Sequence, residues 1–498
     1  MPDSEVNSGV ESGGSSGAES GGSSPAGAAG SPGHPGTDLH LELTGPGSRR
    51  AVLIRALRDA VRTGRLAPGT RLPAYRTLAA DLGIARNTVA DAYAELVAEG
   101  WLSARQGSGT RVAHRAEPLR PARSAAPRTP ADRPAHNLLQ GQPDATSFPR
   151  TAWLAAARRA LSAAPHDAFG PGDPRGRPEL RRALTDYLAR TRGVRTAPGR
   201  IVICSGFAHA LRLLFPAVLP GPLAVESYGL AFHHGLLQKA GIRTHPLTLD
   251  EQGADVSELD ALPGLQAALL TPAHQFPTGV PLHPDRRAAV LNWARSSGGY
   301  VLEDDYDGEF RYDRRPVGAL QGLDPEHVIH LGSVSKSLSP ALRLGWMVLP
   351  ERLVDPVLEA KGEREAWAGV TDQLTLADFL ASGSYDRHIR RMRQRYRGRR
   401  DRLIAAVAAH APHLRLTGIA AGLHAVLQLP DGATHSDEST ALRAARWQGL
   451  ALDGLSGYRH PAATMPPRHG LVVGYAAPSD HAFPGALEAL CRALPVEL

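Results

Sequence analysis

Residues 72–112 read LPAYRTLAADLGIARNTVADAYAELVAEGWLSARQGSGTRV. Pro73 opens a first helical segment, which stops at Gly83, and a second helical segment begins at ARNTV and stops at Gly100. The second segment repeats apolar residues at the spacing of one helix face: Val89, Ala92, Tyr93, Leu96 and Val97. From Trp101 onward apolar and polar residues alternate across a Gly-rich turn, which predicts a β-hairpin.

One more helix is predicted just before this stretch. Ser48 is placed to cap it, and Gly64 is placed to end it. One of its faces is apolar: Leu53, Leu57 and Val61. Three short helices followed by a hairpin make a winged helix-turn-helix, an α+β domain.

The third helix of this domain offers a polar end for recognition. With its apolar stripe turned inward, Arg86, Asn87 and Thr88 lie exposed at its N-terminal end, which is the end that enters the major groove of DNA. Arginine suits a guanine edge and asparagine an adenine edge. The alternative is a small helical bundle whose arginines only face water.

Charge and composition divide the chain further. Residues 1–38 carry five acidic and no basic side chains, and half of them are Gly or Ser, which predicts a disordered tail. Residues 39–136 carry 16 arginines against eight acids, which favours a polyanion partner, although an arginine-rich solvated surface would look the same. Five prolines and five arginines within 114–136 predict an extended linker. We therefore expect a tail over 1–38, the small domain over 39–113, a linker over 114–137 and a large domain over 138–498.

Some classes of protein are disfavoured. The two cysteines, Cys204 and Cys491, provide neither a disulfide framework nor a cysteine-rich metal site, which favours the reducing cytoplasm. No uninterrupted apolar run approaches 18 residues, and no basic, apolar signal segment begins the chain, so we expect no membrane partner.

The large domain alternates apolar strand-like runs with helical stretches. The runs are IVICSG, LAVES, AALLTP, YVLEDD, HVIHLGSVSK and LGWMVLP. This alternation predicts a mostly parallel α/β sheet, in which ligands gather at the carboxyl ends of the strands.

Only three lysines occur in the chain, at positions 239, 336 and 361. Lys239 and Lys361 lie in helical stretches and are interpreted as surface residues. Lys336 instead ends a strand among small hydroxylated residues, in LGSVSKSLSPALRLG, where an aldehyde could be held as a Schiff base. An ordinary loop lysine is the alternative.

Three more strand ends suit the same chemistry. YVLEDDYDGEF ends a strand in carboxylates, and an aspartate facing a pyridine nitrogen keeps that nitrogen protonated. SGFAHAL opens a helix, so the backbone N–H groups of Gly206, Phe207 and Ala208 could cradle a phosphate. Arg343, seven residues after Lys336, could add a bidentate contact to that phosphate.

Residues 72–112 resemble the DNA-binding domain of GntR-family regulators, whose pattern LPs-R-LA--LGvsR-TV--AY--L--EG-L--r-G-GT-V is present at nearly every fixed position. The resemblance implies that Arg76 and Arg86 contact phosphate or base, with Asn87 and Thr88 beside them. It also implies that the wing, which includes Gln106, Gly107 and Thr110, lies on the DNA backbone or in the minor groove. Ala85 replaces the usual Ser or Thr, which removes one hydroxyl contact.

Residues 138–476 resemble fold-type-I aminotransferases, specifically the aminotransferase-like half of MocR-type regulators. The resemblance rests on Phe148–Pro149, GPGDPRGRPELRRALTDYLARTRGV (170–194), TPAHQFPTG (271–279), EDDYDGEFRYD (303–313) and GSVSKSLSPALRLGW (332–346). It implies that Lys336 holds pyridoxal 5'-phosphate (PLP), that Asp304 pairs with the pyridine nitrogen and that Tyr306 approaches the ring hydroxyl. The remaining implied contacts are phosphate ligands, Ser205, Gly206, Phe207, Ser333, Ser335 and Arg343, and ring neighbours, His274 and Gln275. It further implies a homodimer.

Two departures from this family bear on function. The chain reads ESYGL where the family often has E-x-P-G-Y, so Leu230 replaces a stacking aromatic ring unless Tyr228 takes over that role. Val472 stands where many aminotransferases carry an arginine for the substrate carboxylate, with Arg459 and Arg468 nearby but out of register. An unclamped carboxylate weakens the case for ordinary transamination.

The sequence therefore predicts a regulator that binds an operator in double-stranded DNA and PLP, with PLP or an amino compound as its effector. Control of vitamin B6 or amino-compound metabolism would suit such a protein. Two other functions stay open: a working aminotransferase with an accessory DNA-binding domain, and a DNA-binding protein whose large domain is a cofactor-free dimerisation scaffold.

Overall fold

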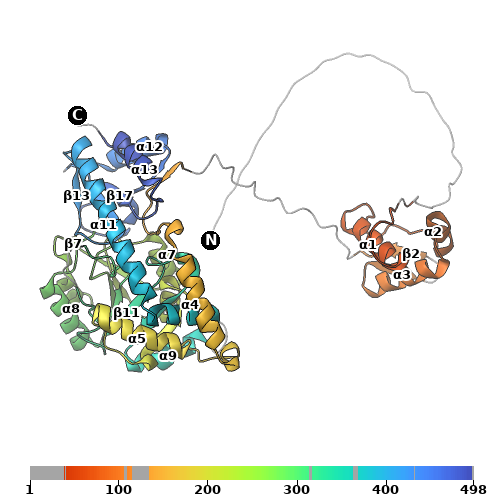
Figure 1. Ribbon diagram of the computed structural model, residues 1–498, viewed down its shortest axis with the longest axis horizontal. Coiled ribbons are helices and arrows are strands. Elements are labelled where there is room, and N and C mark those ends of the chain that lie inside the picture. The colour runs from red at the N-terminus through yellow and green to blue at the C-terminus, as the bar shows by residue number, and fades with distance from the viewer. Residues whose placement is uncertain are drawn as a thin grey trace, which may run out of the picture. The chain divides into compact units, whose positions relative to one another are not determined.

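The computed structural model describes residues 39, 41–105, 109–114, 134–312, 317–362, 368–430 and 432–495. The chain divides into two units, Met1–Thr129 and Pro130–Leu498, which we call the head and the body (Figure 1). The predicted tail over 1–38 and most of the predicted linker lie outside the described residues, as do Gln106 and Gly107 of the predicted wing.

The head is three helices and a hairpin, as predicted. Its elements are α1 (Arg49–Arg62), α2 (Tyr75–Leu82), α3 (Arg86–Ala98) and the antiparallel pair β1 (Leu102–Arg105) and β2 (Gly109–Val112). The Ser48 hydroxyl accepts a hydrogen bond from the Ala51 N–H, which confirms the predicted cap. Gly83 ends α2 in the left-handed conformation, with a φ of 63°. Four residues of the predicted α3 stripe are buried: Val89, Ala92, Tyr93 and Leu96.

A seven-stranded sheet forms the centre of the body, in the order β4-β12-β11-β10-β9-β5-β6. Its strands are β4 (Ile201–Cys204), β5 (Leu223–Glu226), β6 (Thr244–Leu247), β9 (Ala267–Leu270), β10 (Tyr300–Asp304), β11 (Val328–Ser333) and β12 (Gly345–Val348). All pairs are parallel except the two that β12 makes. The six predicted runs are confirmed as strands of a mostly parallel sheet. The sequence analysis missed the edge strand β6, because THPL contains a proline and two polar residues.

Helices cover both faces of this sheet. Ile201 and Ile203 belong to a core shared with α5 (Pro178–Arg192), whereas Val202 and Cys204 pack with α6 (Phe207–Leu214) on the other face. Burial on both faces is the reason that the strands are continuous apolar runs rather than alternating ones. Four more helices belong to the body: α7 (Ala231–Lys239) beside β6, α8 (Pro284–Ser297) beside β10, α10 (Val370–Ala381) against α5, and α4 (Arg150–Ala163) against α10.

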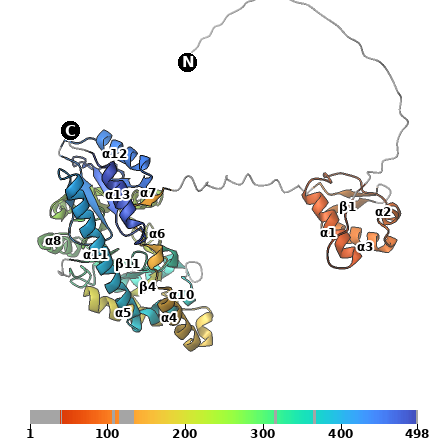
Figure 2. The same cartoon turned by 45° about the horizontal axis from the view of Figure 1, so that its top comes forward.

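A second, antiparallel sheet lies near the C-terminal end of the body. It comprises β13 (Arg415–Thr417), β14 (His424–Gln428), β17 (Gly470–Gly474) and β16 (Asp453–Gly454), with α12 (His435–Trp447) and α13 (Phe483–Ala493) packed nearby. The long helix α11 (Ser384–His410) leads into this part of the chain and runs along the outside of the body in both views (Figures 1 and 2).

Two expectations from the sequence are corrected here. β3 (His136–Asn137) pairs with β15 (Leu450–Ala451), so the body begins before the predicted boundary at 138. Lys361 is not a surface residue: it is 3% exposed at the end of α9 (Glu351–Lys361), where its ammonium donates to the Pro174 and Ile203 carbonyls. Burial lowers the pKa of Lys361 to about 8. The charged sequence of α9 gives no sign of this burial, which arises because the end of the helix packs against β4.

No helix in the described part of the chain is both long enough and apolar enough to cross a membrane.

Candidate functional site

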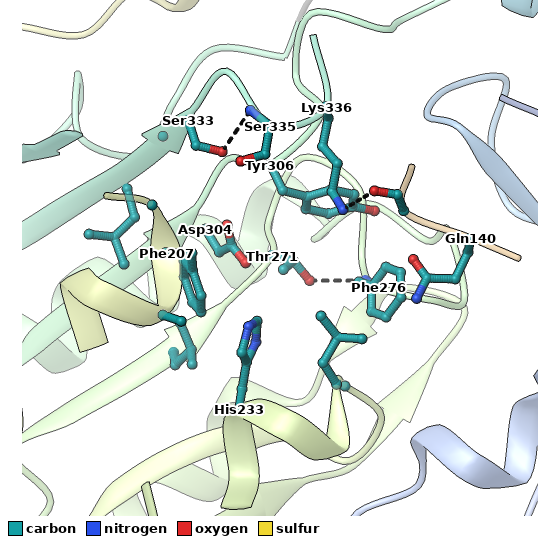
Figure 3. Close-up of a pocket in the computed structure, with 18 of the residues that line it drawn as sticks. Gln140, Phe207, His233, Thr271, Phe276, Asp304, Tyr306, Ser333, Ser335 and Lys336 are labelled. Carbon is teal, nitrogen blue, oxygen red and sulfur yellow. Dashed lines mark hydrogen bonds between the residues drawn. The ribbon is translucent and has the colours of Figure 1, made fainter. Parts of the chain in front are cut away.

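A cavity of about 290 Å³ lies at the carboxyl ends of the parallel strands in the body. Its wall includes Glu226 at the end of β5, Asp304 at the end of β10 and Ser333 at the end of β11. Figure 3 shows Asp304 and Ser333, from two of these strands, beside one shared space. Ligands of open α/β sheets bind at this edge, so the cavity is the candidate functional site.

Lys336 enters the cavity from the turn after β11 (Figure 3). Its ammonium donates a hydrogen bond to the Gly141 carbonyl. Burial lowers the pKa of Lys336, and the carboxylates of Asp304 and Asp307 offset part of that effect. A lowered pKa increases the share of neutral amine, which is the form that attacks an aldehyde.

Three adjacent acids at the end of β10 have three different environments. Asp304 lines the cavity, and burial together with the neighbouring charge of Asp305 raises its pKa well above the usual range, against the opposing field of Lys336. Burial also acts on Asp305, but the charges of Arg192 and His330 outweigh it and lower its pKa. Asp305 accepts two hydrogen bonds from Arg192, at 2.6 and 2.9 Å.

The third acid, Glu303, is fully buried and accepts the backbone N–H groups of Leu320 and Gln321. Glu303 and Asp305 are therefore used inside the protein. Of the three acids, Asp304 is the one that faces the cavity.

Another part of the cavity wall gathers groups that suit an anion. Gly206 caps the N-terminus of α6 with a φ of 107°, a conformation that favours glycine. The first N–H groups of a helix have no carbonyl partner within the helix, and the helix dipole adds positive potential there. Phe207, Ser333, Ser335 and Arg343 line the same cavity. Arg343 comes close to this turn, since a Cβ added to Gly206 would lie 3.9 Å from its guanidinium.

Ser205 differs from this expectation. Its hydroxyl lies 2.9 Å from His209 Nδ1, and its N–H donates to the same nitrogen at 3.0 Å. Ser205 is not among the cavity-lining residues. The reason is local, because a histidine one helical turn later takes up both polar groups of the serine.

The loop 271–279 presents different residues from those predicted. Thr271 and Phe276 face the cavity, and the Phe276 N–H donates to the Thr271 hydroxyl (Figure 3). Gln275 is buried inside the loop, where its amide donates to backbone carbonyls of Tyr228 and Phe276. His274 lies behind the cavity wall.

His274 still contacts one predicted site residue. Its Nδ1 is 2.9 Å from the Tyr306 hydroxyl and 2.8 Å from Asp307 Oδ2. Tyr306 lines the cavity, and burial together with Asp307 and Asp304 raises its pKa well above the usual range. The Tyr306 hydroxyl thus stays protonated and is available to donate a hydrogen bond.

The sequence predicted only some of the aromatic residues that line the cavity. Tyr228 lines the cavity, but its hydroxyl accepts the Arg468 N–H at 2.8 Å, and Leu230 lies beside it. The sequence analysis missed His233 of α7, whose ring centroid is 4.6 Å from that of Phe207. Burial lowers the pKa of His233 to about 4, so its ring is neutral at neutral pH. A histidine pair in a helical stretch gives no sequence signal for such a contact.

No arginine from the second sheet reaches this cavity among the described residues. Val472 is fully buried in β17. The Arg459 guanidinium donates to the carbonyls of Ala463 and Met465, and the Arg468 guanidinium donates to the Leu249 carbonyl.

The head places its predicted contact residues on one exposed helix end and on the preceding helix. Arg86 and Asn87 at the start of α3 are exposed, as is Arg76 on α2, while Thr88 is half-buried. Arg76 and Arg86 form no side-chain hydrogen bond or ion pair with the described part of the chain. By contrast, Arg58 of α1 is paired with Glu99 at 2.7 Å.

Thr110 of the wing requires a correction. It is only 6% exposed, because alternate residues of β2 face the head's core, and Thr110 and Val112 are the inward ones. Its carbonyl accepts the Leu72 N–H. The Thr110 side chain therefore does not face the solvent from which DNA would approach.

The cavity residues fit PLP. The amine of Lys336 can hold an aldehyde. Burial raises the pKa of Asp304 because the charged carboxylate lacks solvation, and a protonated ring nitrogen beside it would stabilise that charged form. The helix N-terminus with two serines and an arginine has the donor chemistry that a phosphate needs.

Two family models match the chain. Residues 50–112 match the model of bacterial regulatory proteins of the gntR family, and residues 135–443 match aminotransferase class I and II. Among curated proteins, the chain is 32% identical to the probable rhizopine catabolism regulatory protein MocR of Rhizobium meliloti, over 85% of this chain and 89% of that one. It is 34% identical to the pyridoxine biosynthesis transcriptional regulator PdxR of Corynebacterium glutamicum, over 77% of this chain and 83% of that one.

Solved aminotransferase structures resemble about three quarters of the chain. An archaeal alanine:glyoxylate aminotransferase covers 72% of this chain and 89% of its own, with a TM-score of 0.63 and 24% identity. An aspartate aminotransferase variant of Thermus thermophilus covers 75% of this chain and all of its own, with a TM-score of 0.62 and 22% identity. At this identity the likeness establishes the fold, and the fold family is PLP-dependent. With its gntR-type head and aminotransferase-type body, the chain belongs to the MocR-type transcriptional regulators of the gntR family.

Proposed function

We propose that this chain binds PLP in the body cavity, binds an operator in double-stranded DNA through the head, and couples the two events. One observation carries the proposal. Lys336, Asp304 and an anion cradle from separate strand ends share one cavity, in a chain whose helix α3 presents an exposed Arg86 that pairs with none of the described residues. The family match supports the same conclusion.

Each cavity residue has a separate task in this proposal. Lys336 would hold the aldehyde of PLP covalently, and Asp304 would hold a proton on the ring nitrogen. The phosphate would lie against the first turn of α6 with Ser333, Ser335 and Arg343. Tyr306 would donate to the ring hydroxyl, and His274 would orient Tyr306 through its Nδ1. Bound PLP supplies an electrophilic aldehyde on an electron-withdrawing ring.

The remaining predicted contacts are secondary or reassigned. Ser205 and Gln275 would position the turn and the loop from behind, because their polar groups are used within the protein. In the head, Arg76, Arg86 and Asn87 would contact DNA, and the family resemblance assigns the same role to Gln106 and Gly107. Thr110 would support the wing from its inner side.

The signal that we favour is PLP itself, in control of vitamin B6 synthesis or salvage. The PdxR relative is named for pyridoxine biosynthesis, and the residues that line the described cavity suit PLP, while the buried Val472 offers no charge to a substrate carboxylate. The alternative effector is an amino compound that reacts at Lys336. Either ligand must bind one arrangement of the protein more tightly than another, because only a difference in affinity can shift such an equilibrium.

A homodimer would suit this architecture. Leu154 is 70% exposed on the outer face of α4, and Leu161 lies on the same helix two turns later. Exposed leucines two turns apart on one helix suggest a covered surface. A two-fold dimer would present two heads to repeated half-sites.

The decisive experiment measures operator affinity with and without PLP, using the native upstream region as probe. A coupling of 1–3 kcal/mol would change the affinity roughly 5- to 150-fold. Equal affinities for the two forms would exclude PLP as the signal. A shift of both visible spectrum and DNA affinity on adding an amine to the PLP-loaded protein would then support the amino compound.

The presence of Lys336 and Asp304 in one cavity also keeps an aminotransferase activity as a second candidate. Amino-group transfer to 2-oxoglutarate at about one turnover per second or more would favour that function over a purely regulatory one.

A further inference from the structure

The helix α11 concentrates the positive charge of the protein. It contains nine arginines and two aspartates in 27 residues, a net charge of +7. The whole chain also has a net charge of +7, so the other 471 residues sum to zero. These arginines can bind a partner only if their guanidinium groups are not already paired within the protein.

Three of the nine arginines are part of the packing. Arg393 donates to the Glu309 carbonyl through two nitrogens. Arg395 pairs with Asp144 and Asp480, and Arg399 is buried against Asp480 and the Tyr475 carbonyl. These contacts hold α11 in place on the body.

Five other arginines are exposed: Arg387, Arg390, Arg391, Arg397 and Arg402. At 100° per residue they fall within about 140° of the helix circumference, so they share one face, which we call the arginine face. At 1.5 Å per residue the arginine face extends over roughly 22 Å. Figures 1 and 2 show that α11 runs along the outside of the body.

Two of these side chains have no polar partner among the residues that the structure describes. Arg387 donates to the Ser384 hydroxyl, Arg391 contacts His388 Nδ1, and Arg402 lies over the Phe483 ring. Arg390 and Arg397 form no side-chain hydrogen bond or ion pair with any described residue. Of the two aspartates, Asp386 is paired with Arg190 at 2.8 Å, and Asp401 is exposed on the arginine face itself.

We propose that the arginine face binds the phosphate backbone of duplex DNA, outside the base pairs that the head reads. The proposal rests on the proposed function, since operator binding by the head is what brings duplex DNA to the body. Arginine suits the task because its planar guanidinium contacts phosphate oxygens in a bidentate way. A length of roughly 22 Å matches about six base pairs of helix rise, at 3.4 Å per base pair along each strand.

The charge pattern favours nucleic acid over the other polyanions. An acidic protein surface would need a matching row of carboxylates, whereas any duplex offers regularly spaced phosphates. Such contacts carry no sequence information, but they raise affinity and fix the position of the body on DNA. A solvated arginine face without a partner is the competing explanation, and it predicts no effect on DNA binding.

The test uses the full chain, loaded with PLP, and a random-sequence duplex of 60 base pairs. Fluorescence anisotropy would give the affinity at several salt concentrations for the wild type and for the double variant Arg390→Ala/Arg397→Ala. We expect the slope of log affinity against log salt to fall by about 1.8, or 0.9 for each lost phosphate contact. The affinity in 0.1 M salt should fall by on the order of tenfold.

Two further variants make the result specific. Arg243→Ala/Arg446→Ala removes the same charge from two exposed arginines elsewhere on the body that pair with none of the described residues, and it should leave the slope close to that of the wild type. Arg390→Lys/Arg397→Lys keeps the charge and should retain most of the slope. An unchanged slope in the double alanine variant, or an equal loss in the Arg243/Arg446 control, would overturn the proposal. Binding that is unchanged on DNA but lost on vesicles containing phosphatidylserine would assign the face to a lipid surface instead and overturn it too.

Failure of the proposed function would be seen separately. A wild type that does not prefer its upstream region over random DNA would contradict operator binding by the head. The arginine face is judged on the random duplex, where no operator is needed.

Discussion

In the head, Arg76 and Arg86 are exposed and unpaired among the described residues, whereas in the body Lys336 and Asp304 are buried and their pKa values are shifted in opposite directions. An exposed charge costs the folded head little, because water solvates it in the folded and unfolded states alike. A buried charge loses that solvation, so the body must provide partners or a ligand for it. Substitutions of these exposed head residues should therefore alter binding alone, while substitutions in the cavity should alter binding and folding together.

The largest expected effect is the loss of the covalent cofactor link. Lys336→Ala removes the amine that would hold the aldehyde, so borohydride treatment should no longer fix PLP on the protein, and the visible band of the wild type should vanish. Mass spectrometry of the reduced protein measures the first outcome and absorbance measures the second. Lys361→Ala is the matched control, since that lysine is also buried but bonded to two carbonyls. Cofactor still fixed on the Lys336→Ala variant would contradict the assignment.

Glu226 tests what burial costs in the cavity wall. Burial raises the pKa of Glu226 to about 7, from its ordinary value of 4.5. The folded state thus binds more protons between these pH values, and the unfolding free energy falls as pH rises from 4.5 through 7, by about 3 kcal/mol.

Glu226→Gln removes this titration. In urea unfolding of the PLP-free protein at pH 5, 6, 7 and 8, the stability of the variant should rise relative to the wild type by up to that amount. The substitution also changes the hydrogen bond from the Thr271 hydroxyl to residue 226, which shifts the stability of the variant by an amount that does not depend on pH. If the unfolding free energies of the wild type and the variant change with pH in the same way, ionising Glu226 costs the folded protein no free energy, which would contradict the prediction.

Sequence patterns predicted which residues of the head are exposed and which residues of the body lie at the strand ends, for a physical reason. Helix periodicity fixes which side chains of α3 face outward, so Arg86 and Asn87 follow from local sequence alone. Lys336 and Asp304 could be found because the carboxyl ends of parallel strands meet at one edge.

The errors arose where contacts between distant segments decide orientation. Gln275 turns into its own loop and Ser205 turns to His209, whereas Lys361 is buried because α9 packs on β4. His233 reaches the cavity because α7 begins shortly after β5, whose carboxyl end borders the cavity. No periodicity within one segment reports such contacts.

A smaller effect is expected from Asp304. Asp304→Asn would replace a charge-assisted hydrogen bond to the ring nitrogen with a neutral one, at a cost of about 1.5–3 kcal/mol, or roughly 10- to 150-fold in Kd. Absorbance titration with PLP measures the change. Asp305→Asn is the contrasting variant: it breaks the buried contact with Arg192 and should lower stability while affecting the visible spectrum less. The reverse pattern would transfer the role to Asp305.

The head should respond differently. Arg86→Ala should cost about 1–3 kcal/mol of operator binding if Arg86 reads a base, with no change in thermal stability. Arg58→Ala removes an arginine paired with Glu99, so it should leave operator affinity unchanged and lower stability by up to about 1 kcal/mol. Electrophoretic shifts at two salt concentrations and thermal melts separate the two. Equal losses of affinity would mean that general charge, and not the recognition helix, binds the operator.

The smallest effect concerns which ring lies against the cofactor. His233 packs on Phe207 within the cavity wall, while Leu230 occupies the position where the family often has an aromatic residue. An aromatic contact contributes about 0.5–1.5 kcal/mol beyond the buried area, so His233→Ala should weaken PLP binding roughly 2- to 12-fold. His233→Phe keeps an aromatic ring and should restore most of the affinity.

Because burial lowers the pKa of His233 to about 4, the ring is neutral at neutral pH, and the affinity difference between the wild type and His233→Phe should not vary between pH 6 and 8. The adjacent Phe232 is 63% exposed, and Phe232→Ala should leave PLP binding unchanged. If His233→Ala and Phe232→Ala bind PLP as tightly as the wild type, the ring contact must come from Tyr228, and Tyr228→Leu is then the variant that should show the loss.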